Sequence, residues 1–100
     1  MSSDPAHAGA RAVTHEPAAR RFVHVEAGHV CVLEYALRDG VATFHHTEVP
    51  PAVGGRGVAA DLVRTGLETA RAQGWSVRPT CSYVAAYMRR HPEYQDLLAR

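Results

Sequence analysis

The sequence predicts a single mixed α/β domain in which an antiparallel β-meander is followed by a helix, a further strand and a second helix. Three observations predict this fold class. A chain of 100 residues has room for one hydrophobic core. Residues 21–49 form β-rich runs of strand length that are separated by glycine-containing turns. Residues 58–74 carry apolar side chains at helical spacing.

The composition limits the class of protein. Hydrophobic residues make up 46% of the chain and the formal net charge is +1, which is typical of a globular protein. Binding to nucleic acid needs a dense basic face, so we expect no nucleic-acid partner. The chain has no Lys, Asn or Ile, whose codons are AT-rich, so we expect a GC-rich, bacterial genome. Without lysine, a catalytic lysine and a Walker A phosphate loop are both excluded.

Cysteine use and hydropathy indicate the compartment. The two cysteines, Cys31 and Cys81, are too few for a disulfide framework in a domain of this size. No run approaches the ~18 apolar residues of a membrane span, and no apolar signal segment lies near the N-terminus. We therefore expect a cytoplasmic protein with reduced thiols and no membrane partner.

The first half of the chain holds the predicted meander. Residues 1–12 are small, polar and aperiodic, so we expect a disordered tail followed by one domain over residues 13–100. Residues 13–19 could begin a strand that breaks at Pro17. The three strands of the meander are predicted over residues 21–26, 29–37 and 41–49.

Side chains alternate between two faces along each of these strands. In the second strand, Cys31 shares its face with Leu33 and Tyr35, which predicts a core position for this cysteine. The third strand is expected to place Ala42, Phe44, His46 and Glu48 on one face and Val41, Thr43, His45 and Thr47 on the other.

Two helices are predicted in the second half of the chain. Pro50-Pro51 ends the meander because neither residue can donate to a strand ladder. The first helix is predicted over residues 58–74, with Asp61 and Arg64 on its solvent side. The remaining elements are a short strand over Trp75–Pro79, a helix over Tyr83–Arg90 with Ser82 as its N-cap, and a last helical turn that begins at Pro92.

A glycine-rich turn precedes the first predicted helix. A helix N-terminus carries unpaired N–H groups and a partial positive charge, and glycines allow an anion to approach the bare backbone. Gly54, Gly55, Arg56 and Gly57 stand at this helix start. The turn therefore predicts a phosphate or pyrophosphate site, and a flexible connecting loop is the alternative. Residues 55–60 also fit the dinucleotide pattern G-x-G-x-x-A, but hairpins rather than a βαβ unit precede them.

Three blocks of sequence together resemble the GNAT acetyltransferase superfamily. They are HTEVPP at residues 46–51, the turn AVGGRG at 52–57, and VAAYMRRHPEY at 84–94. The turn is similar to the superfamily motif Q/R-x-x-G-x-G/A, with Ala52 in place of the leading Q/R. The resemblance covers residues 13–98 and is strongest to a small group of single-domain N-acetyltransferases.

The resemblance implies a GNAT-like fold with acetyl-CoA bound between two splayed strands, and an amine as the acceptor. The group lacks the paired helices that usually cover the acceptor side, so an open acceptor side is expected. The backbone amides of the turn would hold the pyrophosphate, and the pantetheine would run beside the strand that ends at Val49. The cofactor-binding residues implied in this way are Val49, Gly54, Gly55, Arg56, Gly57, Val58 and Ala59.

Three residues are candidates for the chemistry. Cys81 precedes a predicted helix N-terminus, a position that lowers a thiol pKa, so it could accept the acetyl group or relay a proton; a small buried core residue is the alternative. His46 could take the proton of the amine, with Glu48 as a second possible base, or could be a structural residue of the sheet. The resemblance implies that Tyr87 protonates the departing thiolate, although His91-Pro92 replaces the usual Gly-Phe. A core tyrosine packed on the sheet is the alternative, and Tyr83, one helical turn earlier, could take the same part.

Several functional readings stay open at this point. The first is an acetyl-CoA-dependent N-acetyltransferase that uses direct attack by the amine, and a transfer through acetyl-Cys81 is its variant. A non-catalytic acetyl-CoA-binding or CoA-binding module, such as a sensor, is the alternative. A nucleic-acid binder that uses Arg89-Arg90 is weaker. No metal is expected, because the histidines lack compact ligand spacing.

Overall fold

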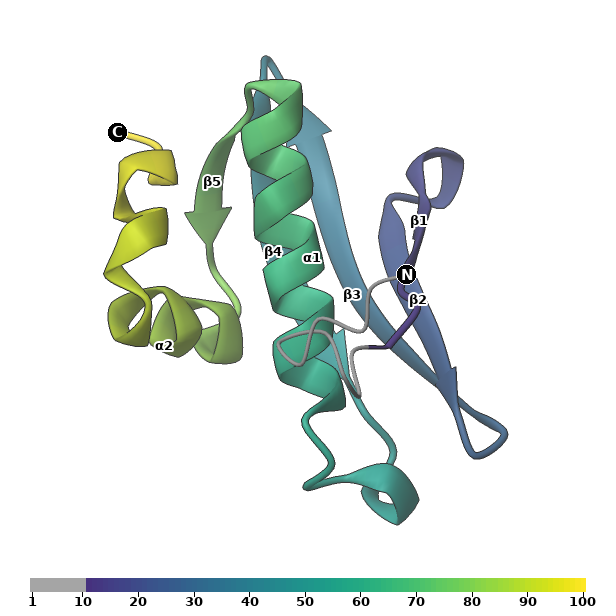
Figure 1. Ribbon diagram of the computed structural model, residues 1–100. Coiled ribbons are helices and arrows are strands. Elements are labelled where there is room, and N and C mark those ends of the chain that lie inside the picture. Colours follow the sequence, from purple (N-terminus) through teal and green to yellow (C-terminus); the bar gives the residue numbers. More distant parts are fainter. Residues whose placement is uncertain (1–10) are drawn as a thin grey trace, which may run out of the picture.

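A five-stranded mixed sheet organises the chain (Figure 1), and the computed structural model describes residues 11–100. The strands are β1 (Thr14–Glu16), β2 (Arg21–Glu26), β3 (His29–Arg38), β4 (Val41–Glu48) and β5 (Ser76–Pro79). They lie in sequence order across the sheet, β1 to β4 are antiparallel, and β5 runs parallel to β4. This arrangement confirms the predicted meander and the mixed α/β class.

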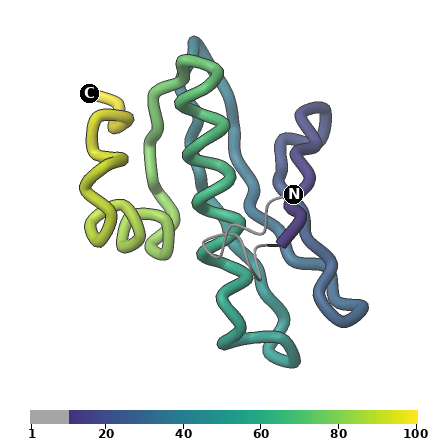
Figure 2. The backbone as a smooth tube through the Cα atoms, in the orientation of Figure 1, coloured from purple at the N-terminus to yellow at the C-terminus, as the bar shows by residue number. Residues whose placement is uncertain are grey.

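Within residues 11–100, two α-helices and three short 3-10 helices join the sheet. They are η2 (Pro17–Ala19), η3 (Pro51–Val53), α1 (Val58–Gln73), α2 (Ser82–Arg90) and η4 (Pro92–Leu97). Each 3-10 helix has a proline in its first turn, where the missing N–H would be unpaired in any case. Gly74 ends α1 in the left-handed conformation, with φ of 74°, and its N–H caps the helix on the carbonyl groups of Ala70 and Arg71. The smooth trace in Figure 2 shows the chain reversing between β4 and α1, so the two elements run in opposite directions.

The start of α2 differs by one residue from the prediction. Cys81, rather than Ser82, is the N-cap, with φ of −75° and ψ of 129°, and its carbonyl group accepts the first helical bond from the N–H of Ala85. The helix thus begins one residue earlier than predicted, at Ser82. The N–H of Cys81 donates to the carbonyl group of Phe44 at 3.0 Å, which joins this extended residue to β4.

The hydrophobic core lies between the sheet and α1, and α2 and η4 add side chains to it. Gly66 lets α1 approach the sheet closely: a Cβ atom there would lie 2.8 Å from Cδ2 of Leu33 and 3.3 Å from the ring of Phe44. Cys31 is fully buried in this core, as predicted. Asp61 was expected on the solvent side of α1, but it is buried because two arginines reach it, as described below.

A β-bulge changes the predicted faces of β4. Leu33 pairs with Thr47, and Tyr35 pairs with Phe44. Two steps along β3 therefore match three steps along β4, with His45 as the extra residue. Since paired residues share a face, Thr47 lies on the α1 face together with Phe44, and His46 lies on the opposite face. The prediction that Phe44, His46 and Glu48 share one face is wrong for this reason.

The other face of the sheet is less covered. Val25 and Val30, which pair with each other across β2 and β3, keep 56% and 52% of their surface exposed. At the N-terminal side, the predicted tail lies outside the described residues except for Arg11 and Ala12. Both make hydrogen bonds: Arg11 to Glu26, and the carbonyl group of Ala12 with the His24 ring at 3.1 Å. These bonds join the last two residues of the predicted tail to β2.

Candidate functional site

The glycine turn joins η3 to α1 and takes conformations that need glycine. Gly55 and Gly57 have φ values of 77° and 85°, in the left-handed region that side chains with a Cβ atom rarely adopt. Gly54 has an ordinary extended backbone, and its N–H donates to the carbonyl group of Pro51 at 3.1 Å. Of the predicted cofactor-binding glycines, Gly54 therefore uses its N–H for a hydrogen bond within the turn rather than offering it to a ligand.

Backbone N–H groups gather at the start of α1. The first helical bond runs from the N–H of Asp61 to the carbonyl group of Gly57 at 3.1 Å, and no side chain from the described part of the chain caps the helix. Within residues 11–100, no backbone or side-chain group accepts a hydrogen bond from the N–H groups of residues 55–60. These amides and the positive end of the helix form an arrangement that binds anions.

Two valines and an alanine of the predicted cofactor site lie beside this turn. Val58 is buried under the first turn of α1, whereas Ala59 is half-buried. Val49 follows β4 and packs against the core as a half-buried side chain. The end of β4 and the start of α1 are therefore joined by one short connection with apolar walls.

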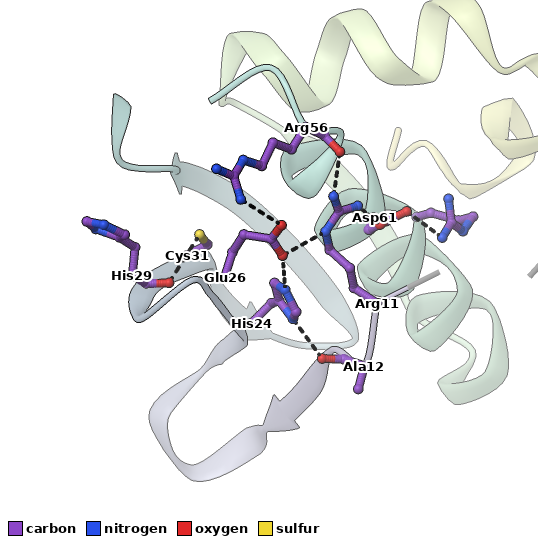
Figure 3. Close-up of polar contacts among 9 residues, drawn as sticks. Arg11, Ala12, His24, Glu26, His29, Cys31, Arg56 and Asp61 are labelled. Atoms are coloured by element: carbon purple, nitrogen blue, oxygen red, sulfur yellow. Dashed lines mark hydrogen bonds and ion pairs between the residues drawn. The ribbon is translucent and has the colours of Figure 1, made fainter. Parts of the chain in front are cut away.

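Arg56 carries a charge at the same turn. Its guanidinium Nη1 lies 3.5 Å from Oε2 of Glu26, and 48% of its side chain is exposed. The Glu26 carboxylate also receives bonds from His24 and Arg11, and these bonds, that of His24 first, lower the pKa of Glu26 to about 2. Arg56 therefore faces an ionised carboxylate but keeps access to solvent (Figure 3).

Cys81 lies where the pairing of β4 with β5 ends. The last strand pair is Phe44 with Pro79, and the Cys81 Sγ atom lies 3.5 Å from Oγ1 of Thr47. Partial burial raises the pKa of the Cys81 thiol, but hydrogen bonds from Thr47 and from the first N–H groups of α2 outweigh it, so the net pKa is lowered. By contrast, burial raises the pKa of Cys31.

His46 and Glu48 form a pair on the sheet face away from α1. The His46 Nε2 atom lies 3.1 Å from Oε1 of Glu48, and both side chains are largely exposed. The bulge separates this pair from Thr47, which lies on the other face of β4. The structure therefore brings together the two predicted bases, but it places them across the strand from the residue that contacts Cys81.

Tyr87 is buried on the inner side of α2. Its ring stacks on that of His91 with centroids 4.0 Å apart and an interplanar angle of 24°. Burial raises the pKa of Tyr87, an effect that outweighs the nearby Arg64 guanidinium, so the hydroxyl is protonated at neutral pH. Tyr83, the neighbour one turn earlier, is 39% exposed, and burial likewise raises its pKa.

Sequence reasoning missed four residues of this region. Thr47 was assigned to the wrong face of β4 because a bulge leaves no local signal in the sequence. Arg11 was assigned to the tail, and Asp61 to solvent. Glu26 was treated only as the end of a strand. An acidic residue in the first turn of a helix is one signal that was present, since it must find a cation if the turn is buried.

Other sites are less well supported by the described residues. A depression of about 390 Å³ is lined by Ala36, Arg38, Asp39, Val41, Thr43 and Arg78. It lies near the β3–β4 hairpin and contains none of the predicted site residues. Within residues 11–100, no cluster of three or more histidine, cysteine or acidic side chains could hold a metal ion. In the same part of the chain, no helix has the length and apolar character needed to cross a membrane.

Comparison with known proteins gives the family. A sequence model of the GCN5-related N-acetyl-transferase family matches residues 20–97. Relatives named Protein NATD1, from Gallus gallus, Mus musculus and Homo sapiens, are each 32% identical over 89 residues, or 85% of this chain. The match covers 80% of the first two relatives and 78% of the third.

A solved structure shows the same fold. The NMR solution structure of a GCN5-like protein from Staphylococcus aureus superposes with a TM-score of 0.68, at 22% sequence identity, over 90% of this chain and 89% of that one. The family match spans both the glycine turn and Cys81. The chain therefore belongs to the GCN5-related N-acetyltransferase family.

Proposed function

We propose that this protein is an acetyl-CoA-dependent N-acetyltransferase that moves an acetyl group to an amine. The observation that carries the proposal is the set of N–H groups at residues 55–60, which donate to no described residue and stand at the positive end of α1. Membership of the family supports the same reaction class.

The cofactor is proposed to bind with its pyrophosphate at the glycine turn. The N–H groups of Gly55 to Ala59 would donate to phosphate oxygens, and Arg56 would add a charge once it turns from Glu26. The pantetheine would follow β4 from Val49 toward Thr47. This path brings the thioester to the end of the β4–β5 pairing, beside Cys81.

Direct transfer needs a base and an acid. The amine nitrogen attacks the thioester carbonyl carbon, a C–N bond forms, and the C–S bond breaks as the CoA sulfur leaves as a thiolate. His46, supported by the Glu48 carboxylate, is proposed to take the amine proton through water, because it lies across β4 from Thr47 and Cys81. Tyr87, which is kept protonated by burial, is proposed to give a proton to the thiolate.

A transfer through Cys81 is the variant. The Cys81 thiolate would attack the thioester, CoA would leave, and the acetyl group would pass from the new thioester to the amine. The lowered pKa of Cys81 and its contact with Thr47 favour this variant. Mass spectrometry after mixing with acetyl-CoA alone distinguishes the two routes, because only the variant leaves an acetyl group on Cys81.

The test is release of CoA from acetyl-CoA with a broad panel of amines. An N-acetyltransferase releases CoA only in the presence of its acceptor and forms an equal amount of acetylated amine. Binding of CoA without turnover of any amine would support the non-catalytic CoA-binding module or sensor instead. The acceptor, a cytoplasmic location and a bacterial origin stay predictions.

A further inference from the structure

Arg11 connects three separate parts of the chain beside the glycine turn (Figure 3). Its Nε atom donates to Oε1 of Glu26 at 3.0 Å, and its Nη1 atom donates to Oδ2 of Asp61 at 2.7 Å. Its Nη2 atom donates to the backbone carbonyl group of Arg56. Only 18% of the Arg11 side chain is exposed, so this fork of bonds is largely shielded from solvent.

The two carboxylates that hold Arg11 are themselves fixed. Oε1 of Glu26 also faces Nε2 of His24 at 2.7 Å, and Oδ1 of Asp61 accepts a bond from Nη2 of Arg64 at 2.7 Å. The bonds to Asp61 and then Glu26 raise the pKa of Arg11 further, so its charge is permanent. Glu26 belongs to β2 and Asp61 to α1, which gives the Arg11 guanidinium one defined orientation.

The third bond of Arg11 fixes a peptide plane in the turn. In a trans peptide the C=O and the next N–H point in opposite directions, and the described residues contain no cis peptide. The carbonyl group of Arg56 is held toward Arg11, so the N–H of Gly57 must point to the opposite side. Arg11 also packs beside Gly57, since a Cβ atom there would lie 3.7 Å from its Nη1 atom.

We propose that Arg11 is a positioning residue for the cofactor, which it never touches: it holds the peptide between residues 56 and 57 so that the Gly57 N–H faces the pyrophosphate. This inference rests on the proposed function. Arg56 has a different part, because its longer and more exposed pair with Glu26 leaves its guanidinium able to reach a phosphate. One arginine shapes the turn and the other contacts the ligand.

The test compares CoA binding by calorimetry for the wild-type chain, Arg11→Gln and Arg11→Lys. Arg11→Lys retains the charge between Glu26 and Asp61, but an ammonium cannot reproduce a planar fork with three fixed directions. We expect both variants to bind CoA and dephospho-CoA about 10-fold more weakly, because one well-aimed bond to phosphate is lost. Arg21→Gln is the control. Arg21 forms an ion pair with Glu16, with Nε 2.6 Å from Oε1, and this pair does not involve the glycine turn.

Two readouts separate positioning from a general loss of structure. Binding of pantetheine, which has no phosphate, should be equal in the wild-type chain and Arg11→Lys when followed by NMR shifts along β4. The Gly57 amide signal of the variants should shift in the unliganded protein, while signals of the far end of α1 stay in place.

The outcomes are distinct. If Arg11→Lys binds CoA with the same affinity as the wild-type chain, the positioning role is overturned and the proposed function still stands. Failure of the wild-type chain itself to bind CoA would overturn both. If Arg11→Gln does not fold, Arg11→Lys alone decides, because it keeps a positive charge between the two carboxylates.

Discussion

The Sγ atom of Cys81 lies 3.5 Å from the Oγ1 atom of Thr47, although 34 residues separate the two in sequence. The contact exists because the bulge at His45 turns Thr47 to the face of β4 that Cys81 reaches. The N–H of Cys81 also donates to the carbonyl group of Phe44, so the thiol is fixed at the last point where β4 and β5 are joined. The environment of the candidate nucleophile is therefore set by β4 together with the first turn of α2.

Replacing Thr47 should change the acidity of Cys81. Partial burial raises the pKa of this thiol and the Thr47 hydroxyl is the largest of the groups that lower it, so Thr47→Val should raise the pKa. The rate at which iodoacetamide alkylates Cys81 should rise with pH in both proteins. In Thr47→Val the midpoint of this rise should lie at a higher pH than in the wild-type chain. Thr47→Ser is the matched control and should retain the wild-type midpoint. Equal midpoints for Thr47→Val and the wild-type chain would show that the hydroxyl has no such effect.

The two cysteines should differ in reactivity in the same chain. Cys81 has a lowered pKa and is partly exposed, whereas Cys31 is fully buried and has a raised pKa. Cys81 should therefore be alkylated much faster near neutral pH. If the thioester end of the cofactor lies beside Cys81, CoA should protect it. Peptide mapping by mass spectrometry measures both rates, and faster labelling of Cys31 would contradict the assignment of the two environments.

Much of this fold and the position of the glycine turn could be predicted from local patterns, but the contacts around the turn and around Cys81 could not. The glycine turns, the alternation along the strands and the apolar spacing of α1 depend only on residues that are close in sequence. These local patterns were enough to predict the meander and both helices. The bulge at His45 results from the pairing of β3 with β4, and no residue type in the sequence indicates its position. Arg11 shows the same limit, because its role depends on Glu26 and Asp61, which meet it only in the folded chain.

The two ends of α1 offer a matched test of the glycine turn. Gly57 and Gly74 both have left-handed backbones, with φ of 85° and 74°, so valine at either position carries a similar backbone strain. Gly57→Val should also displace the peptide that presents the amides of the turn, because its side chain would press on Arg11, and should weaken CoA binding by at least ~10-fold through the loss of charge-assisted bonds. Gly74→Val should lose similar stability with unchanged CoA affinity. Calorimetry measures the affinity of both variants for CoA. If the two affinities are equal, the glycine turn is not the cofactor site.

Gly66 tests the contact between α1 and the sheet. A glycine-to-alanine change in a helix normally stabilises by about 1 kcal/mol, but a Cβ atom at Gly66 would lie 2.8 Å from the buried Leu33 and 3.3 Å from Phe44. Overpacking of this kind costs about 1–3 kcal/mol, so Gly66→Ala should lower the free energy of unfolding. Ala72→Gly, at an exposed position of the same helix, calibrates the propensity effect. Urea titration that shows Gly66→Ala to be more stable than wild type would mean that α1 and the sheet are less closely packed.

The most direct measurement is an NMR titration of the ¹⁵N-labelled protein with CoA. The account predicts saturable shifts that are largest for the backbone amides of residues 55–59, because these N–H groups become donors to the pyrophosphate. Smaller shifts should follow β4 as far as Thr47 and reach Cys81 at the thiol end of the cofactor. Saturable shifts confined to the β3–β4 hairpin, or no shift at the glycine turn at CoA concentrations that saturate other family members, would contradict the central claim that the start of α1 holds the cofactor.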